Sequence, residues 1–555
     1  MKQNFQISWK LAFVALVVSI VLWWLCNNGD WYNYSATITS TPQCPEVVDS
    51  KQQEEPPQQM QHFQQFQQPL QHASARNKFQ QEPQQQQLQL EGEAEGETKT
   101  NYGCENGVQP VVKYAIVFDA GSTGTRIHIF ETRVCALEAR ILRDREVLFR
   151  ALEPGLSHFA QQPERAAQSI VPLLDAALAT VPRHLWSTTL VALYATAGMR
   201  LLGEQQVTQI LTHVQHVIEQ YPFRLWHGEG STTTGVAVTG TMRMGTTRVG
   251  VTGTREIRTG GVTGTETREP KMGVTRGTTG TGAVAVITGR DEGLYGWMSV
   301  NYLISRDGRE ANAAVIDCGG ASLQISFPVM NEVKEKTPQN AHNHFVPVKL
   351  SGNTGLIYQH SYLGYGLLEA RKKIKDAFIQ SLEQHSETNV VPVNCLPGDF
   401  SEQFGNHVIQ GTGVDVANCE RKIGQIFNFH HPCEFKTCSF NGTFHPEIEG
   451  NPLVKEIYLI QYFNEKVSNA GLAPRCTLAQ LSQRIEQCSE TGYLNGSRDP
   501  HLCSDLIYLK LLLKYAFRIH DQQVLFATRK LSGYEISWAV GAGVAMALDE
   551  TLQDN

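Results

Sequence analysis

Short apolar runs followed by glycine-rich polar turns are the most regular hydrophobic pattern along this chain. Residues 114–118, Tyr-Ala-Ile-Val-Phe, carry β-branched and aromatic side chains that predict a buried strand. Residues 126–130, Arg-Ile-His-Ile-Phe, alternate polar and apolar positions and predict a second strand. Between them, glycines at 121 and 124 permit the backbone angles of a tight turn. The sequence therefore predicts a β-hairpin whose tip presents backbone N–H groups that can converge on an anion.

The same pattern returns in the second half of the chain, where residues 314–327 predict strand, polar turn and strand. Each turn begins with an aspartate, Asp119 in the first and Asp317 in the second, and continues with glycines and hydroxyl side chains. A single turn of this kind is usually only a hairpin. Because the aspartate has the same offset in both, the repetition predicts two related lobes that hold one polyphosphate between them.

Helical patterns lie between and after these hairpins. Residues 166–178 and 205–218 are amphipathic, and residues 294–304 place Leu, Trp, Met and Tyr at helical spacing. An apolar run at 283–287 predicts a strand before that third helix, and residues 542–548 predict a short apolar helix. A chain of 555 residues is long enough for two lobes with well-buried cores.

Residues 11–26 form the only run in the sequence apolar enough for a membrane, and lysines at 2 and 10 precede it. A cleaved signal peptide is one interpretation, but the residues from Cys26 onward lack a small-residue cleavage site. Tryptophans at 23 and 24 suit a membrane interface. We therefore expect an uncleaved anchor within residues 1–26, with a cytoplasmic N-terminus. A core helix is disfavoured because the run has no polar face.

Two low-complexity segments separate the patterned parts of the chain. Residues 27–112 are rich in glutamine and lack the apolar periodicity of a core, so we expect a disordered stem. Residues 229–282 are rich in Thr, Gly and Arg and repeat Val-Thr-Gly-Thr at 238, 251 and 262. We expect this insert to be a solvent-exposed loop outside the sheet, or an error in the gene model. A loop that binds polyanions is the alternative.

Five stretches of the chain carry a family resemblance. They are DAGSTGTR at 119–126, ATAGMR at 195–200, GRDEGLYGW at 289–297, DCGGASLQ at 317–324 and SYLGYG at 361–366. In this order they resemble the apyrase conserved regions of the nucleoside triphosphate diphosphohydrolase family. The resemblance implies an α/β, two-lobed fold like that of actin, the Hsp70 ATPase domain and the sugar kinases (ribonuclease H-like). The active site is then expected in the cleft between the lobes.

The implied fold places residues 113–228 and about 534–555 in lobe I, and residues 283–533 in lobe II. The C-terminal helix is then expected to pack back on lobe I. Three other functions compete with hydrolysis. A sugar kinase would need a sugar-site signature that the sequence lacks, and an Hsp70-like chaperone would need a separate peptide-binding domain. A nucleotide-binding relative without activity is disfavoured because the residues that would carry catalysis are present.

The resemblance assigns the two hairpins to phosphate binding and their aspartates to a metal ion. Asp119 and Asp317 are anions, so they suit the water ligands of Mg²⁺ or Ca²⁺ better than they suit phosphate. Backbone N–H groups, hydroxyls and one guanidinium are left to hold the phosphates. The expected phosphate-binding residues are Ser122, Thr123, Gly124, Arg126, Gly320, Ala321 and Ser322.

Catalysis is expected to depend on a carboxylate in the third conserved stretch. Glu292 is then the general base that takes a proton from the attacking water, and Ser322 and Gln324 hold that water in line. The resemblance also places Thr196 near the attacked phosphate. The structural alternative for Glu292 is a carboxylate that only stabilises the N-terminus of its helix.

The sequence carries only part of the family's pattern of aromatic residues that bind the nucleobase. By resemblance, the ring of Tyr508 stacks on the nucleobase, whereas the family's second aromatic position corresponds here to Asn464, beside Tyr462 and Phe463. We expect this departure to relax selectivity between bases.

The cysteines favour an oxidising compartment. By resemblance, three disulfides are expected, namely Cys395–Cys419, Cys433–Cys438 and Cys488–Cys503. A metal site at the second of these pairs is disfavoured because no other ligand pair has matching spacing. We expect Cys318 to be a free buried thiol, whereas Cys44 and Cys104 in the stem could link two chains. Asn441 and Asn495 are in glycosylation sequons.

The single anchor and residues 362–371 resemble the organelle-resident or secreted branch of the family. That branch implies hydrolysis of nucleoside diphosphates, chiefly UDP and GDP, by a luminal head in the Golgi or endoplasmic reticulum membrane. Secretion after cleavage of the stem and a broad ATP/ADP apyrase outside the cell are the alternatives. The net charge of −7 gives no reason to expect nucleic-acid binding.

Overall fold

The structure is a computed structural model. It describes residues 104, 109–135, 140–226, 242–243, 246–248, 280–281, 283–350, 353–383, 389–488 and 492–553. The expected anchor, most of the expected stem and most of the insert therefore lie outside the described residues. Within the described part of the chain, no helix combines the length and apolarity that a membrane crossing needs.

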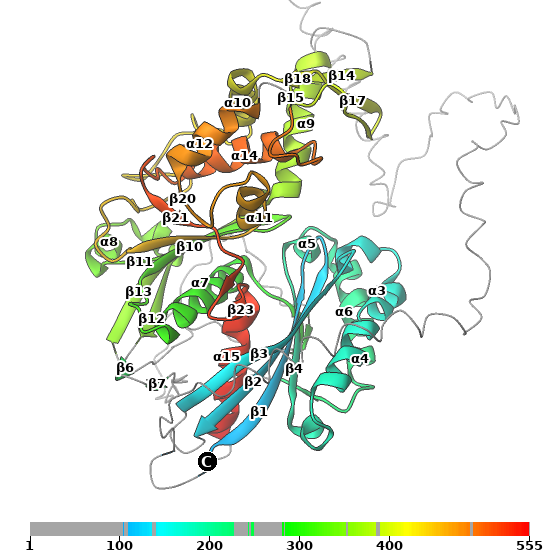
Figure 1. The fold of residues 1–555 in the computed structure, drawn as a ribbon, viewed down its shortest axis with the longest axis vertical. Coiled ribbons are helices and arrows are strands. Elements are labelled where there is room, and N and C mark those ends of the chain that lie inside the picture. Colours follow the sequence, from blue (N-terminus) through cyan, green and yellow to red (C-terminus); the bar gives the residue numbers. More distant parts are fainter. Residues whose placement is uncertain are drawn as a thin grey trace, which may run out of the picture. The chain divides into compact units, whose positions relative to one another are not determined.

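The first sheet is built around the first predicted hairpin (Figure 1). Its main strands are β1 (Val111–Ala120), β2 (Thr125–Cys135), β3 (Arg140–Leu152), β4 (Leu190–Ala195) and β9 (Val284–Val286), with β5 (Arg224–Leu225) beside β4. They lie in the order β3-β2-β1-β4-β9. The first three strands are antiparallel, and β4 and β9 run parallel to β1.

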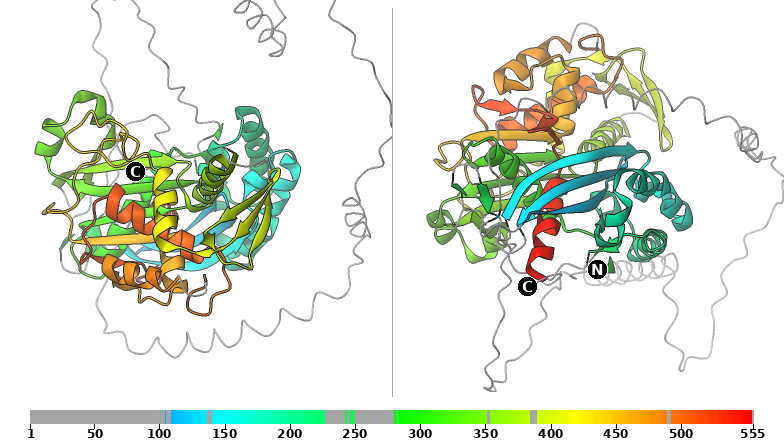
Figure 2. Two further views of the ribbon diagram at one scale, coloured as in Figure 1. Left: turned by 90° about the horizontal axis from the view of Figure 1, so that it is seen from above. Right: turned by 60° about the horizontal axis from the view of Figure 1, so that its bottom comes forward.

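Helices cover both faces of this sheet (Figures 1 and 2). Ile116 and Phe118 of β1 pack with α3 (Pro163–Ser169), α4 (Val171–Thr180) and α6 (Glu204–Ile218). Val117 points to the other face, because successive side chains of a strand alternate, and packs with α15 (Trp538–Gln553). The prediction that the C-terminal helix packs on lobe I is therefore confirmed.

The second sheet repeats this topology around the second hairpin. Its strands are β10 (Ala313–Cys318), β11 (Ser322–Val329), β12 (Phe345–Leu350), β13 (Asn353–Leu363), β19 (Glu456–Gln461), β20 (Arg475–Thr477) and β21 (Val524–Phe526). The order β13-β11-β10-β19-β21 matches that of the first sheet, again with three antiparallel strands followed by two parallel ones. The repeated order confirms the predicted fold class, a two-lobed ribonuclease H-like α/β protein.

Helices flank the second sheet as they do the first. Trp297 of α7 (Gly289–Arg306) packs on one face, with Val315 of β10 and Ile357 of β13. The opposite face packs against α9 (Leu367–Glu383), α11 (Tyr462–Asn469) and α14 (Leu502–Leu511), with α10 (Val416–Gln425) and α12 (Leu478–Glu486) beyond. Each fully buried large apolar side chain contributes about 1.5–3 kcal/mol.

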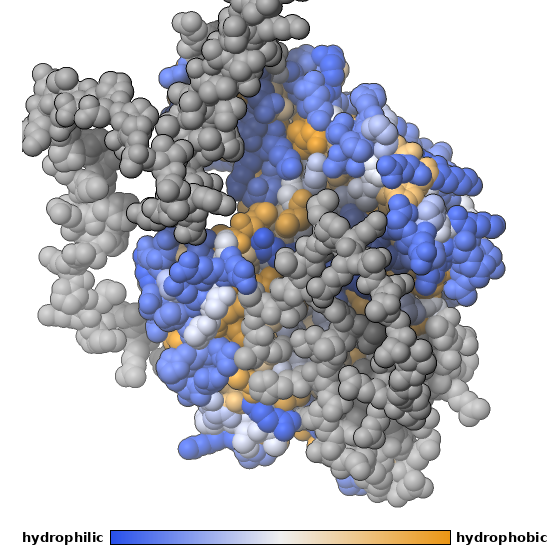
Figure 3. All heavy atoms as spheres, turned by 180° about the vertical axis from the view of Figure 1, so that it is seen from behind, coloured by the Kyte–Doolittle hydropathy of each residue, from blue (hydrophilic) through white to orange (hydrophobic). Residues whose placement is uncertain are grey.

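Short elements complete the described chain. The helical ones are η5 (Leu156–Phe159), η6 (Arg183–Thr188), α5 (Ala197–Arg200), α8 (Asn331–Glu335), η7 (Gln339–His344) and the π-turn η8 (Leu512–Ala516). The strands are β14 (Val390–Val393), β15 (Cys395–Leu396), β16 (Ser401–Phe404), β17 (His407–Gly411), β18 (Gly413–Val414), β22 (Lys530–Leu531) and β23 (Tyr534–Glu535). On the face seen in Figure 3, hydrophilic residues dominate the described surface.

Two of the predicted boundaries are wrong. The strand at 284–286 was expected to open lobe II, but it pairs with β4 and so belongs to the first sheet. The insert was expected to stay outside that sheet, yet parts of it pair with the sheet. These parts are β7 (Thr246–Arg248) next to β3, β6 (Met242–Arg243) next to β7, and β8 (Gly280–Thr281) next to β9. Edge strands present unpaired N–H and C=O groups, which explains why adjacent chain joins them.

The structure contains the three expected disulfides, Cys395–Cys419, Cys433–Cys438 and Cys488–Cys503. It also contains a fourth, Cys104–Cys135, which ties the end of the expected stem to β2. The prediction that Cys104 links two chains is therefore wrong, because its sulfur is already paired within the chain; Cys44 lies outside the described residues. Cys318 is a buried free thiol, as expected.

Candidate active site

The two hairpin turns have the same local geometry. In the first, Gly121 N donates to Gly124 O at 2.9 Å, and in the second Gly319 N donates to Ser322 O at 3.0 Å. Asp119 lies opposite Arg126 on the neighbouring strand, and Asp317 lies opposite Gln324. Each aspartate thus sits where its strand enters the turn.

The turns approach each other closely. A Cβ atom at Gly320 would lie 2.3 Å from the Ser122 hydroxyl oxygen, so any larger residue there would displace that hydroxyl. Between the turns lies an open cleft of about 410 Å³. Its lining residues are Asp119, Gly121, Ser122, Thr123, Arg126, Thr196, Ala197, Glu292, Asp317, Gly319, Gly320, Ala321, Ser322, Gln461, Tyr462 and Trp538. The structure therefore brings together most of the residues selected from the sequence.

Glu292 is held at the first turn of α7. The helix begins after Thr288, whose hydroxyl accepts a hydrogen bond from the Asp291 N–H at 3.1 Å. Glu292 is only 7% exposed. Burial raises the pKa of its carboxyl to about 7, against the opposing charge of Arg200, while Asp119 adds to the rise. A carboxylate whose pKa lies near neutrality is well matched to take and release a proton.

Hydrogen bonds fix the orientation of this carboxylate. Arg200 forms an ion pair with Glu292, and its Nη2 lies 3.3 Å from the Ser322 hydroxyl. The Gln324 amide nitrogen lies 2.9 Å from Glu292 Oε2, 2.6 Å from Ser322 Oγ and 3.1 Å from Ser361 Oγ. The other end of that amide, Gln324 Oε1, is buried and has no hydrogen-bond partner among the described protein atoms. Because buried acceptors are normally paired, this oxygen is available to a bound water.

Asp119 and Asp317 are placed to hold a divalent cation. They are 3% and 5% exposed. Burial raises the pKa of both carboxyls, and the nearby charges of Glu292 and Asp119 raise that of Asp317 further. Arg126, 3.7 Å from Asp119, opposes this rise at both sites. A divalent cation would offset the remaining repulsion between three carboxylates in one cleft.

The donor set indicates how such a cation would be held. Among the residues with described side chains, no group of three or more histidine, cysteine or acidic side chains is placed to ligate a metal directly. Two aspartates that contact the ion through its waters fit this geometry, and Mg²⁺ commonly keeps several waters in protein sites.

Thr196 lies where the first lobe meets the cleft. It follows β4, and its N–H donates to Ala120 O at 3.1 Å, which ties it to the end of β1. The next residues form the single turn α5, which carries Arg200 to Glu292. Gln324 and Gly124 do not line the cleft themselves. The amide nitrogen of Gln324 contacts Glu292 and Ser322, which do line it.

The prediction that Tyr508 is free to stack on a nucleobase is wrong. Its side chain is 0% exposed, its ring stacks on Phe427 with 5.3 Å between centroids, and its hydroxyl donates to Tyr365 O at 2.6 Å. Tyr508 is therefore part of the lobe II core. Gln461 and Tyr462 line the cleft instead. Gln461 has a φ of 60°, a strained conformation that is frequent at functional sites.

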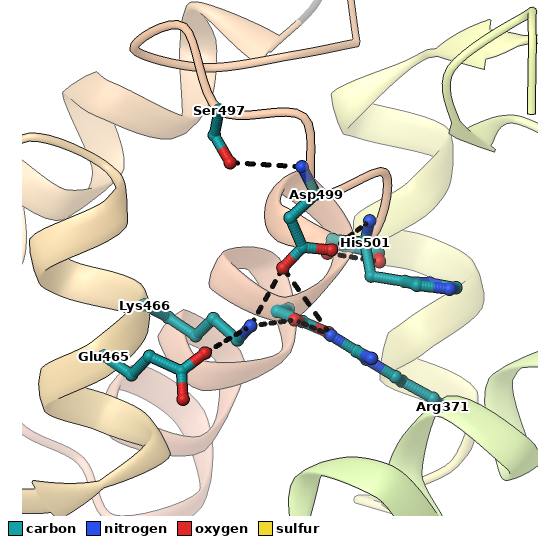
Figure 4. Close-up of polar contacts among 8 residues, drawn as sticks. Arg371, Glu465, Lys466, Ser497, Asp499 and His501 are labelled. Atoms are coloured by element: carbon teal, nitrogen blue, oxygen red, sulfur yellow. Dashed lines mark hydrogen bonds and ion pairs between the residues drawn. The ribbon is translucent and has the colours of Figure 1, made fainter. Parts of the chain in front are cut away.

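Buried ion pairs anchor the helix that carries Tyr462 (Figure 4). Lys466 is 3% exposed, and its Nζ lies 2.9 Å from Asp499 and 3.5 Å from Asp505. Burial opposes the charge on Lys466, but Asp505, Asp499 and Glu465 outweigh it and raise the Lys466 pKa. Arg371 also pairs with Asp505. These contacts join α11 to α14 and α9, so they hold the helix that carries Tyr462 in place.

Several residues at the site were not assigned a role from the sequence. Arg200 belongs to ATAGMR, a stretch that carries the family resemblance, so its place in that stretch could have indicated a role at the site. Ser361 was likewise part of a quoted stretch without a role. Trp538 had no local signal, because its place in the cleft depends on how α15 packs.

This arrangement defines a class of protein. Two glycine-rich turns lie on a cleft, beside a carboxyl whose pKa is near neutrality and a buried amide oxygen without a partner among the described protein atoms. This geometry suits hydrolysis of a phosphoanhydride, where positioning and electrostatic stabilisation supply most of the catalysis.

The chain belongs to the GDA1/CD39 (nucleoside phosphatase) family, whose sequence profile matches residues 108–229 and 274–555. It is therefore an enzyme of the nucleoside phosphatase class, and the profile passes over most of the insert. The guanosine-diphosphatase of Schizosaccharomyces pombe is 28% identical over 475 residues, which cover 80% of this chain and 75% of the relative. The guanosine-diphosphatase of Saccharomyces cerevisiae is 29% identical over 476 residues, covering 78% and 80%. Human nucleoside diphosphate phosphatase ENTPD5 is 27% identical over 459 residues, covering 79% and 88%.

Proposed function

We propose that this enzyme hydrolyses the terminal phosphate of nucleoside diphosphates, GDP and UDP foremost, with Glu292 as the general base. The observation that carries the proposal is the buried cluster of Glu292, Gln324 and Ser322, with one amide oxygen left unpaired. The relatives named guanosine-diphosphatase and nucleoside diphosphate phosphatase support the choice of diphosphates.

In this mechanism the two turns hold adjacent phosphates, one from each lobe. Backbone N–H groups and hydroxyls of residues 122–124 and 320–322 supply donors, and Arg126 adds a charge-assisted bond. Gln324 Oε1 accepts a hydrogen bond from the attacking water, and the Ser322 hydroxyl completes its orientation. Glu292 takes the proton as the water oxygen attacks phosphorus in line and the nucleoside monophosphate leaves. No covalent intermediate is needed.

Arg200 has a separate part in this scheme. Its ion pair with Glu292 keeps part of the carboxyl population deprotonated in spite of burial. It also lies within reach of Ser322, so it links the base to the water site.

The cofactor is proposed to be Mg²⁺ or Ca²⁺, held through water by Asp119 and Asp317. Its chemical contribution when bound is to neutralise phosphate charge. The excess of buried carboxylates over arginines in the cleft supports a cation of this kind.

We propose that the enzyme acts in the lumen of the Golgi or endoplasmic reticulum, where nucleoside diphosphates remain after glycosyl transfer. Four disulfides within the described part of the chain support an oxidising compartment. Asn441 and Asn495 are both exposed, which suits glycosylation of their sequons. Attachment by residues 11–26 as a type II anchor is part of this proposal.

A substrate panel tests the function. The full chain, produced in a secretory host, is compared on GDP, UDP and ADP and on the matching triphosphates, with Mg²⁺ or Ca²⁺. We expect kcat/KM for GDP and UDP to exceed the triphosphate values. The matched control is Glu292→Gln, which keeps the size and hydrogen bonding of the base and should lower kcat by about 10²-fold or more. Equal or faster hydrolysis of triphosphates would refute the diphosphate preference, and near-normal turnover of Glu292→Gln would refute the mechanism.

A further inference from the structure

A second hydrogen-bonded chain of catalytic-type residues lies outside the cleft. His128 on β2 places its Nδ1 2.7 Å from Glu146 Oε1 on β3, and its Nε2 3.3 Å from the Ser537 hydroxyl, one residue before α15. His128 is 0% exposed and Ser537 is 2% exposed. Only 6% of the Glu146 side chain is exposed. None of these residues has a role in the mechanism above.

The connectivity is that of a Ser-His-acid triad, but the surroundings exclude a nucleophile. The Ser537 oxygen already accepts the Ala539 N–H at 3.1 Å. With a neutral imidazole, Nδ1–H donates to Glu146 and the Ser537 hydroxyl donates to Nε2, so every member of the chain is paired. The burial of all three leaves no approach for a substrate. A structural or positioning role remains.

The chain leads directly to the active-site cleft. Trp538, the residue after Ser537, lines that cleft, and its ring packs against Tyr194 with 6.1 Å between centroids. Asp119 lines the same cleft, and Trp538 is one of the groups, after Arg126 and His128, that lower the pKa of that carboxyl. The second Glu146 oxygen accepts the N–H of Glu535 at 2.8 Å. The chain is thus held at Glu535 and at Ser537, just before Trp538, and these contacts set the position of Trp538.

We propose that Glu146, His128 and Ser537 form a positioning network, which fixes Trp538 against Asp119 and thereby sets the affinity of the cleft for its divalent cation. The Arg126 guanidinium pairs with the Asp119 carboxylate, with Nη1 3.7 Å from Oδ2, and Trp538 lines the same cleft. When Trp538 is free to move, the carboxylate can turn fully to Arg126 and lose the orientation that suits the water ligands of a cation. The inference rests on the proposed role of Asp119.

The test separates positioning from simple support of the fold. Ser537→Ala removes the hydroxyl, and Ser537→Thr restores one. The matched control is Tyr534→Phe, which removes another buried bond of the same C-terminal segment, from Tyr534 to Asp144 at 2.6 Å, without touching Trp538. For each full-length variant we would measure the Mg²⁺ concentration for half-maximal rate, the KM for GDP at saturating Mg²⁺, and Tm. The change in tryptophan fluorescence on adding Mg²⁺ alone, referenced to Trp538→Phe, reports cation binding without turnover.

We expect Ser537→Ala to raise the Mg²⁺ requirement by about tenfold in both rate and fluorescence, at the lower end of effects seen when groups behind metal ligands are removed. KM for GDP at saturating Mg²⁺ should stay within about twofold. Ser537→Thr should restore the wild-type Mg²⁺ requirement. Tyr534→Phe should lower Tm without raising the Mg²⁺ requirement.

If Ser537→Ala and Tyr534→Phe lower Tm alike and neither changes the Mg²⁺ requirement, the network only stabilises the fold and the proposal is overturned. Should Ser537→Ala fail to fold, His128→Asn serves instead, since its amide can still donate to Glu146. If both fail while Tyr534→Phe folds, the network acts in folding and the proposal is overturned. A wild-type chain that releases no phosphate refutes the proposed function, while the fluorescence titration still tests the network.

Discussion

Removal of the Arg200 charge should move the pH dependence of hydrolysis to higher pH. Burial already raises the pKa of Glu292 to about 7, and Arg200 is the cation that opposes this rise. Arg200→Ala leaves the burial in place and removes the opposing charge. The protonated form of Glu292 cannot accept the proton of water, so a higher pKa removes active base at neutral pH.

The magnitude follows from the ion pair. Two unit charges about 4 Å apart interact by about 4 kcal/mol at an effective dielectric constant of about 20. At about 1.4 kcal/mol for each tenfold change in the ionisation constant, the upper limit for the rise in pKa is roughly three. The Arg200 side chain is 16% exposed, so solvent screens part of its interaction with Glu292. We therefore expect the pKa to rise by about one to two, which lowers the deprotonated fraction at pH 7 from about one half to roughly one tenth or one hundredth.

The assay is phosphate release from GDP at saturating Mg²⁺ between pH 5 and about 10, fitted for the pKa of the acidic limb. The rate of Arg200→Ala at pH 7 should fall by roughly 5- to 50-fold and recover most of its loss by about pH 9. Arg200→Lys keeps a charge and should shift the limb less, while Glu292→Gln should lose the limb. An acidic limb that stays in place, or moves to lower pH in Arg200→Ala, would falsify the argument.

Three further changes follow from the same structure. Asp119→Ala and Asp317→Ala should each raise the Mg²⁺ or Ca²⁺ needed for half-maximal rate by about tenfold or more, and unchanged hydrolysis in excess EDTA would contradict a metal role altogether. Lys466→Met leaves the buried Asp505 with Arg371 as its cation and should lower the free energy of unfolding by about 1–3 kcal/mol in a urea titration, whereas the exposed Lys372→Met should change it little. Joining Gly230 to Ala283 removes only two-residue and three-residue edge strands from the described sheet, so activity and Tm should be retained; a folded deletion without hydrolysis would give the insert a part in the site.

Local chemistry made much of this protein predictable from sequence. Alternating side chains and two turn glycines determine the hairpin that carries Asp119, and the same pattern determines the one that carries Asp317. Both lie within single short segments, where the residues that act together are also neighbours in the chain. The family resemblance extended this prediction to Glu292 and Gln324, and to disulfides that the structure contains.

Packing decided the rest, because it brings together residues that no local pattern connects. Arg200 and Glu292 are 92 positions apart, and Ser537 and His128 are 409 apart, so their contacts exist only after the lobes and the C-terminal helix are assembled. The family resemblance implies that the ring of Tyr508 stacks on a base, but that ring is buried against Phe427 in the core. The short β9 run could have started lobe II, yet its backbone pairs with β4. A short segment determines its own hairpin, whereas the neighbours of a buried ring or a distant charge are set by the packing of the whole chain.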